Sequence, residues 1–451
     1  MRVPATARNT TGHRPMGRWS PSQLPKIQRW VAGKVNEAKE RNLPLDPSLV
    51  AFRRLVESNP TWKALADPMF TQSSKYYDPT GEPAIRSFEE FLNVINLLIK
   101  SSPPFYVKET PETAMEMIGL PINTIMNWPM GTMAGHEFWL MPEINASFKI
   151  VLNTWGSFLS SSASRDSLNG WLSEEALVMI EEAANCGKKG PTFEEIFVCD
   201  AIAPYYGYAS WDDFFTRKFR DGIRPVECPD DAPPTLNCPD PTLVIANACE
   251  SAPLQVAENV KLQDTFWLKS QPYSLDRMMN NSPLASQFVG GTVYQAFLSS
   301  KSYHRWHAPV SGSVINIEKV PGTYYSENYF EGLAGNWRAA DPAAPNNSQA
   351  YLSAVATRAI IWIEAKNPTI GLMAIVFIGM AEVSACEFTV SVGDAVVKGQ
   401  DIGMFHFGGS THCLVFRKGV KLRFCNEPPW NMATEQNNRV NSALAIASAC
   451  D

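Results

Sequence analysis

The sequence is short of concentrated charge. Its 451 residues contain 39 lysines and arginines against 45 aspartates and glutamates, a formal net charge of −6, and neither sign forms a long block. A basic surface for nucleic acid or for an anionic membrane is therefore not expected. The longest apolar stretch, around residues 370–380, is well below the roughly 20 residues that a membrane-spanning helix needs.

The sequence also lacks the cysteine patterns of disulfide-rich or zinc-bound folds. The nine cysteines are odd in number and widely spaced, and none of them forms a C-x-x-C pair. We therefore expect neither a disulfide framework nor a structural zinc site. The N-terminal segment carries basic residues but no apolar signal-peptide core, so we expect a cytoplasmic protein.

The chain does have enough apolar material for a large folded protein. Hydrophobic residues make up 45% of a sequence that is longer than most single domains, so two domains are expected. The first part predicts helices, because residues that favour helix starts recur before apolar residues of helical spacing. These starts are Asp46-Pro47, Ser87 with Glu90, Ser173 with Glu174, and Thr192 with Glu195.

The character of the sequence changes after a proline-rich segment. Beyond it, stretches rich in valine, isoleucine and aromatic residues alternate with glycine and proline, which is typical of antiparallel strands. The predicted fold class is α+β, with a helical N-terminal domain followed by a mainly antiparallel β catalytic domain. The predicted divisions are a flexible N-terminus (1–30), the helical domain (31–223), a linker (224–241) and the β-rich domain (242–451).

Two segments of the β-rich part have unusual patterns. Residues 391–405 resemble the β-hairpin of biotinyl and lipoyl carrier barrels, which predicts a barrel-like hairpin core. A carrier function is not expected, because residues 379–383 lack the lysine that would be modified. Residues 326–350 have no periodic pattern, and we interpret them as either a lid or a disordered loop.

Histidines are scarce, and four of the six lie in two short motifs. His304 and His307 belong to YHRWHAP, and His406 and His412 belong to HFGGSTH. The first pair could bind a metal ion, but no carboxylate lies beside it to complete a site, so no metal is expected. Taken alone, the pair is better explained as hydrogen-bonded packing residues beside Trp306.

The segment Gly408-Gly409-Ser410-Thr411 has two interpretations. Two glycines before a serine usually mark a turn. Glycines also permit a strained backbone, in which the serine hydroxyl can attack the carbonyl of the peptide bond before it. If a histidine accepts the hydroxyl proton, the result is an N-to-O acyl shift within the chain.

The two motifs together resemble the phosphatidylserine decarboxylase family, whose members carry YHRxHxP and a later Gly-Ser-Thr or Gly-Ser-Ser sequence. Here they stand at residues 303–309 and 407–411, and DDFFTR at 212–217 and the segment 267–275 are further similarities. The sequence is still more similar to a soluble fungal branch of the family, the L-tryptophan decarboxylases of psilocybin biosynthesis. The segments that resemble this branch are 154–160, 170–174 and 199–207.

The resemblance implies self-cleavage between Gly409 and Ser410. Ser410 would become the N-terminal pyruvoyl group of a 42-residue C-terminal fragment, which would stay bound to the larger chain. No pyridoxal phosphate would be required, because the pyruvoyl group takes the same electron-accepting role. His307 would be the general base for Ser410, and His304 the proton donor in decarboxylation. Glu250 stands where the family has an aspartate and would orient His307.

The implied reaction is the decarboxylation of a free L-amino acid, with L-tryptophan or a related aromatic amino acid as the substrate. The alternatives are another small amino acid or phosphatidylserine, although the lipid would call for a membrane anchor that the sequence does not display. An alternative of a different class is an uncleaved binding protein that keeps the β fold without the chemistry. The expected partners are thus the free amino acid and the chain's own cleaved fragment, with no nucleic acid and no membrane.

Overall fold

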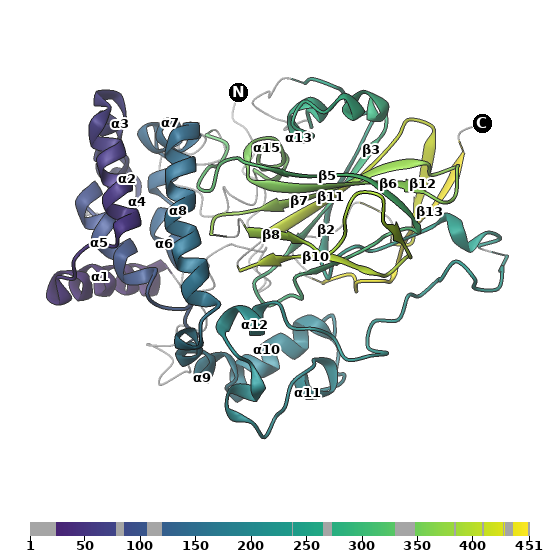
Figure 1. Ribbon diagram of the computed structural model, residues 1–451, viewed down its shortest axis with the longest axis horizontal. Coiled ribbons are helices and arrows are strands. Elements are labelled where there is room, and N and C mark those ends of the chain that lie inside the picture. Colours follow the sequence, from purple (N-terminus) through teal and green to yellow (C-terminus); the bar gives the residue numbers. More distant parts are fainter. Residues whose placement is uncertain are drawn as a thin grey trace, which may run out of the picture.

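The computed structural model describes residues 24–77, 85–105, 120–236, 238–264, 273–329, 348–382, 385–407, 410–426, 428 and 436–449. Helices dominate its first part and strands its second, which makes the fold α+β (Figure 1). The expected flexible segment before residue 24 and most of the expected loop at 326–350 lie outside the described residues.

The first part is built from short and medium-length helices. They are α1 (Leu24–Arg41), α2 (Pro47–Ser58), α3 (Pro60–Ala66), α4 (Pro68–Tyr77), α5 (Phe88–Leu98), α6 (Pro121–Met126), α7 (Met133–Leu140), α8 (Pro142–Leu159), α9 (Leu168–Trp171), α10 (Glu174–Ala184), α11 (Phe193–Ile196) and α12 (Trp211–Phe215). Two more helices, α13 (Leu275–Met278) and α15 (Gln349–Val355), belong to the second part.

The predicted helix starts are confirmed. The Asp46 side chain accepts a hydrogen bond from the Ser48 amide at the start of α2. Ser87 and Ser173 cap α5 and α10 in the same way. The capping box of Thr192 with Glu195 is present at the start of α11. Each of these side chains satisfies an amide that the first helical turn leaves without a partner.

The second part consists of antiparallel strands. They are β1 (Val244–Ala246), β2 (Ala252–Glu258), β3 (Thr292–Leu298), β4 (Arg305–His307), β5 (Gly312–Val320), β6 (Arg358–Ala365), β7 (Leu372–Gly379), β8 (Ala385–Phe388), β9 (Ala395–Val396), β10 (Asp401–His406), β11 (Ser410–Phe416), β12 (Val420–Phe424) and β13 (Ala443–Ala449). The main sheet has the order β2-β3-β11-β7-β6-β5-β9, and two three-stranded sheets have the orders β4-β10-β8 and β1-β13-β12.

The expected barrel-like hairpin core is not confirmed. The described strands form open sheets rather than a closed barrel. Within the carrier-like segment, β9 pairs with β5, whereas β10 pairs with β4 and β8, so the two strands do not pair with each other. The local pattern of turns and apolar residues was correctly assigned to strands, but it does not determine which partner each strand finds.

One hydrophobic core joins the helices to the sheets. Tyr325 and Phe407, from the second part, belong to the same buried cluster as the residues of α2, α5 and α8. In Figure 1, α8 is the helix of this group that stands beside the ends of β7, β8 and β10. Among the described helices, none is long and apolar enough to cross a membrane. The domain boundaries given above stay predictions.

Candidate active site

Ser410 lies where several strand ends meet. It is the first residue of β11, the third strand of the main sheet, and it pairs with Leu298 of β3 and Gly379 of β7. Its side chain is fully buried, and its hydroxyl oxygen has no hydrogen-bond partner among the described residues. Buried hydroxyl groups are normally paired, so this oxygen is a candidate for a chemical role. Gly409 lies outside the described residues.

The residue before the two glycines has a strained backbone. Phe407 has a φ of 41°, a left-handed conformation that costs a non-glycine residue free energy. Its ring is held edge-on by Trp155 of α8 at 4.5 Å and by Trp211 of α12 at 4.6 Å between ring centroids. The helical part therefore fixes the chain immediately before the expected cleavage site.

His304 is packed close to the same segment. Its carbonyl accepts a hydrogen bond of 2.9 Å from the Phe405 amide, and its fully buried ring stacks on Phe215 at 3.9 Å. Phe215 in turn lies 5.8 Å from the Phe407 ring. The imidazole of His304 thus belongs to the aromatic layer that surrounds the residues just before Ser410.

His307 is the last residue of β4, where it pairs with Asp401 of β10. Its Nδ1 is 2.7 Å from the Gly399 carbonyl, which can only accept, so Nδ1 carries a proton. Burial lowers the pKa of His307, which favours the neutral ring and leaves Nε2 as an acceptor. That nitrogen is 3.0 Å from the Tyr303 hydroxyl. No hydrogen bond joins either histidine to the Ser410 hydroxyl in the described structure.

Glu250 is placed differently from the sequence-based expectation. Its buried carboxylate accepts hydrogen bonds from the Arg224 guanidinium at 2.6 and 3.1 Å and from the Val440 amide at 2.8 Å. His307 is oriented instead by Gly399 and Tyr303. In this structure Glu250 ties the start of the proline-rich segment to the β-rich part, and no contact through which it would orient His307 is present among the described residues.

Two further histidines flank Ser410 in contrasting surroundings. His406 lies between two carboxylates, with Nδ1 3.0 Å from Asp212 and Nε2 2.9 Å from Glu387. Burial alone would lower the pKa of His406, but the two carboxylates raise it above its ordinary value. His412 is fully buried without a hydrogen-bond partner in the described structure, and burial lowers its pKa to about 3.

The other face of β11 carries a closed polar network. The Thr411 hydroxyl donates to the Ala296 backbone carbonyl at 2.9 Å and accepts from the side-chain amide nitrogen of Gln295 at 3.1 Å. The Gln295 carbonyl oxygen accepts from Tyr273, which also contacts Gln255. Because successive side chains on a strand point to opposite faces, this network and the Ser410 hydroxyl lie on opposite sides of the sheet.

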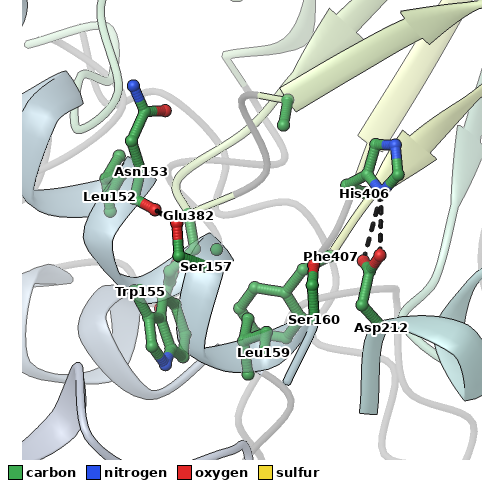
Figure 2. Close-up of a pocket in the computed structure, with 12 residues that line it drawn as sticks. Leu152, Asn153, Trp155, Ser157, Leu159, Ser160, Asp212, Glu382, His406 and Phe407 are labelled. Carbon is green, nitrogen blue, oxygen red and sulfur yellow. Dashed lines mark hydrogen bonds and ion pairs between the residues drawn. The ribbon is translucent and has the colours of Figure 1, made fainter. Parts of the chain in front are cut away.

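A pocket of about 420 Å³ opens beside this region. Residues of α8 from Leu152 to Leu159, with Ser160 directly after the helix, form one wall, and Asp212, Glu382, His406 and Phe407 contribute to the remainder. Figure 2 shows Glu382 on the α8 side of the pocket, with His406 and Asp212 on the other side. Pockets of this size suit small organic ligands.

Sequence reasoning singled out Ser410, His304 and His307 but missed Glu382 and the carboxylate partners of His406. Glu382 follows the end of β7 by three residues, and only the pairing of Gly379 with Ser410 brings it to the same sheet edge. Asp212 is far from His406 in the sequence. The period-two alternation of a strand could have placed His412 on the Ser410 face. No cluster of described residues provides the ligands for a metal ion.

Comparisons with known proteins identify the family of the chain. A sequence profile described as phosphatidylserine decarboxylase matches residues 211–445, and a second profile for phosphatidylserine decarboxylase matches residues 46–180. Together they cover both the helical and the β-rich parts. The chain therefore belongs to the phosphatidylserine decarboxylase family.

Curated relatives resemble the chain over most of its length. A decarboxylase of Amanita muscaria named iboD is 41% identical over 78% of this chain and 99% of its own length. The L-tryptophan decarboxylase of Psilocybe cubensis is 39% identical over 81% of this chain and 80% of its own length. The phosphatidylserine decarboxylase proenzyme 3 of Schizosaccharomyces pombe is 28% identical over 51% of this chain and 21% of its own length.

Proposed function

We propose that the chain is a pyruvoyl-dependent decarboxylase that converts L-tryptophan, or a related free aromatic L-amino acid, to the amine and carbon dioxide. The similarity to relatives named L-tryptophan decarboxylases, which extends over both parts of the chain, is the observation that carries this proposal. The decarboxylase named iboD is equally similar and its name states no substrate, so we keep another free amino acid as the second candidate.

The residues around Ser410 fit the formation of a pyruvoyl group. A buried hydroxyl that has no hydrogen-bond partner among the described residues, directly after two glycines in the sequence, is available to attack the Gly409 carbonyl. The Ser410 Oγ–Gly409 carbon bond forms as the peptide C–N bond breaks, and the hydroxyl proton passes through a base to the freed nitrogen of Ser410. Loss of the Gly409 carboxylate by β-elimination, followed by addition of water and release of ammonia, completes the conversion. The left-handed conformation of Phe407 supports a strained cleavage segment.

The family resemblance assigns the base to His307 and the later proton donor to His304, and we keep both assignments as proposals. The neutral ring expected for His307 is suited to accept a proton at Nε2, and for it to act on Ser410 the contact of Nε2 with the Tyr303 hydroxyl has to be exchanged. His304 packs nearer to the residues before Ser410. A pyruvoyl group supplies an electrophilic carbonyl that takes up the electrons released when the substrate carboxylate leaves. The protein contributes orientation, proton transfer and exclusion of water.

The size of the pocket supports a free amino acid over a lipid. About 420 Å³ accommodates an aromatic amino acid, whereas a phospholipid with two acyl chains needs a far longer apolar surface. We expect activity without added pyridoxal phosphate and inhibition by phenylhydrazine, a carbonyl reagent. The expected cytoplasmic location and the bound C-terminal fragment stay predictions.

The test compares kcat/KM for L-tryptophan, L-phenylalanine, L-tyrosine, L-serine and detergent-dispersed phosphatidylserine, with amine formation as the readout. We expect L-tryptophan to give the highest value and Ser410→Ala to give none. Ser448→Ala, at an exposed position on β13, is the matched control and should keep activity. A higher value for phosphatidylserine would contradict the proposed substrate class, and a strict requirement for pyridoxal phosphate would contradict the mechanism.

A further inference from the structure

The pocket beside the cleavage segment contains a carboxyl group with one unsatisfied oxygen. Glu382 is 5% exposed, and its Oε1 accepts a hydrogen bond of 2.8 Å from the Asn123 amide in the first turn of α6. Its Oε2 is buried without a hydrogen-bond partner in the described part of the chain. Burial raises the pKa of this carboxyl group to about 7, and the nearby backbone N–H groups of Asn123, Ile122 and Glu382 itself lower it by less.

A purely structural role explains only half of this arrangement. Capping of α6 uses Oε1, and a carboxylate is favourable at a helix start. Leaving the second oxygen unpaired costs free energy, because buried polar groups are normally satisfied. Two nearby donors on α8 are already in use: the Ser157 hydroxyl donates to the Asn153 carbonyl, and the Trp155 ring N–H donates to the Ser101 carbonyl.

The backbone holds Glu382 in this position at a cost. Ala381, the residue before it, has a φ of 56°, a left-handed conformation that is unusual for alanine. Phe407, which also lines the pocket, has the other left-handed backbone described above. Strained residues of this kind cluster at functional sites. Phe407 lines this pocket, and Ala381 directly precedes Glu382, which also lines it.

The sheet brings Glu382 and Ser410 to the same edge. Ser410 pairs with Gly379 at the end of β7, and Glu382 follows three residues later. The pocket thus extends from Glu382 to Phe407, three residues before Ser410. Its wall includes Trp155 and Gly156, and a Cβ added at Gly156 would meet no atom within 4 Å. Residue 410 follows Phe407 by three residues and pairs with Gly379, three residues before Glu382, so a substrate bound at residue 410 would lie beside this space.

We propose that this pocket binds the side chain of the amino-acid substrate and that Glu382 is a specificity-determining residue whose Oε2 accepts a hydrogen bond from a ring N–H. The preferred substrate class is therefore a heteroaromatic amino acid with an N–H donor. This inference rests on the proposed decarboxylase function and adds to it the residue that reads the side chain.

The cost of leaving a buried acceptor unpaired sets how strongly the enzyme should prefer a substrate with a ring N–H over one of the same shape without it. A substrate of the same shape without the donor leaves Oε2 unsatisfied, which corresponds to roughly a ten- to hundredfold loss in kcat/KM. A donor on the substrate completes the hydrogen bonding of the pocket. Shape alone discriminates much less between similar flat rings.

The experiment compares kcat/KM for L-tryptophan with that for 3-(3-benzothienyl)-L-alanine, in which sulfur replaces the ring N–H. We expect the wild-type ratio to be at least about tenfold in favour of tryptophan and to fall close to one in Glu382→Leu. Glu382→Gln keeps an acceptor oxygen and should give an intermediate ratio. Glu143→Gln, which changes an exposed carboxylate on α8 outside the pocket lining, is the matched control and should keep the wild-type ratio.

A second variant tests the pocket independently of Glu382. Gly156→Leu should fill the space and raise KM for tryptophan at least about tenfold, while intact mass shows that self-cleavage still occurs. An unchanged ratio in Glu382→Leu, or an unchanged KM in Gly156→Leu, would overturn the inference and leave the proposed function standing. Absence of turnover of every amino acid by the wild-type protein would overturn both.

Discussion

Two neighbouring hydroxyl groups on β11 have opposite surroundings. Thr411 donates to Ala296 and accepts from Gln295, within a network that continues to Tyr273. Ser410 points to the other face and has no partner among the described residues. Satisfied buried groups stabilise a fold, whereas an unsatisfied one is tolerated where it serves a reaction. Under the proposed mechanism, the comparison separates a structural face of the strand, with Thr411, from a chemical face, with Ser410.

The largest effect is expected for the chemical face itself. Ser410→Ala removes the nucleophile, so the protein should remain one uncleaved chain and lose all decarboxylase activity. Thr411→Ser, one residue away, keeps the hydroxyl of the structural face and should still cleave. Denaturing electrophoresis distinguishes the two outcomes. Cleavage of Ser410→Ala would show that the wrong residue has been assigned.

The two histidines near this face should separate the two steps of the chemistry. A general base contributes on the order of 100-fold or more, so His307→Ala should slow self-cleavage by that order. His304→Ala should cleave at least in part and yet decarboxylate poorly. A cleavage time course by mass spectrometry, followed by an activity assay on the cleaved fraction, measures both. Equal loss of both steps in both variants would contradict the division of roles.

Substitutions in the polar network of the structural face should lower the free energy of unfolding rather than block self-cleavage. Gln295→Leu removes the centre of the network and leaves Thr411 and Tyr273 with fewer partners. We expect the free energy of unfolding to fall by about 1–3 kcal/mol, with self-cleavage retained. Gln255→Leu, at the half-exposed end of the same network, is the control and should cost less. Urea unfolding measures both, and an equal cost would show that the network is not centred on Gln295.

The smallest effect concerns the two histidines that flank Ser410. Burial lowers the pKa of His412 to about 3, so the unfolded chain binds more protons than the folded one below pH 6.5 and stability falls as the pH falls. The pKa of His406 is raised instead, so its contribution to the free energy of unfolding has the opposite pH dependence. This contribution is fully present below pH 6.5 and is lost as the pH rises through the pKa of the folded state.

Variants at these positions should tilt the pH profile of stability in opposite directions. His412→Leu should gain about 1–2 kcal/mol relative to the wild-type protein between pH 7 and pH 5. His406→Gln should lose more stability at pH 6 than at pH 9. Urea unfolding across this pH range gives the slopes, and parallel profiles for both variants would contradict the assigned surroundings.

Much of the local structure was predictable from the sequence. The caps at Asp46, Ser87 and Ser173 begin helices because a short polar side chain satisfies an exposed amide of the first turn. The strands β5, β6 and β7 follow from runs of branched and aromatic residues. These features depend on neighbours in the chain, and a single sequence carries that information.

The arrangement of the site was not predictable in the same way. The surroundings of Glu382 depend on β7 lying beside β11, and those of His406 on a contact with Asp212 in a different part of the chain. The expected role of Glu250 followed a family position, but its length and charge suit the Arg224 guanidinium in this structure. Pairings between distant segments are decided by packing, which local patterns do not specify.

The most direct test of the account is the intact mass of the purified wild-type protein. We predict two associated fragments, residues 1–409 and 410–451, with the smaller one an ammonia lighter than the unmodified peptide and without a free amino terminus. A single full-length chain that nevertheless decarboxylates L-tryptophan would contradict the central claim that Ser410 supplies the reactive group.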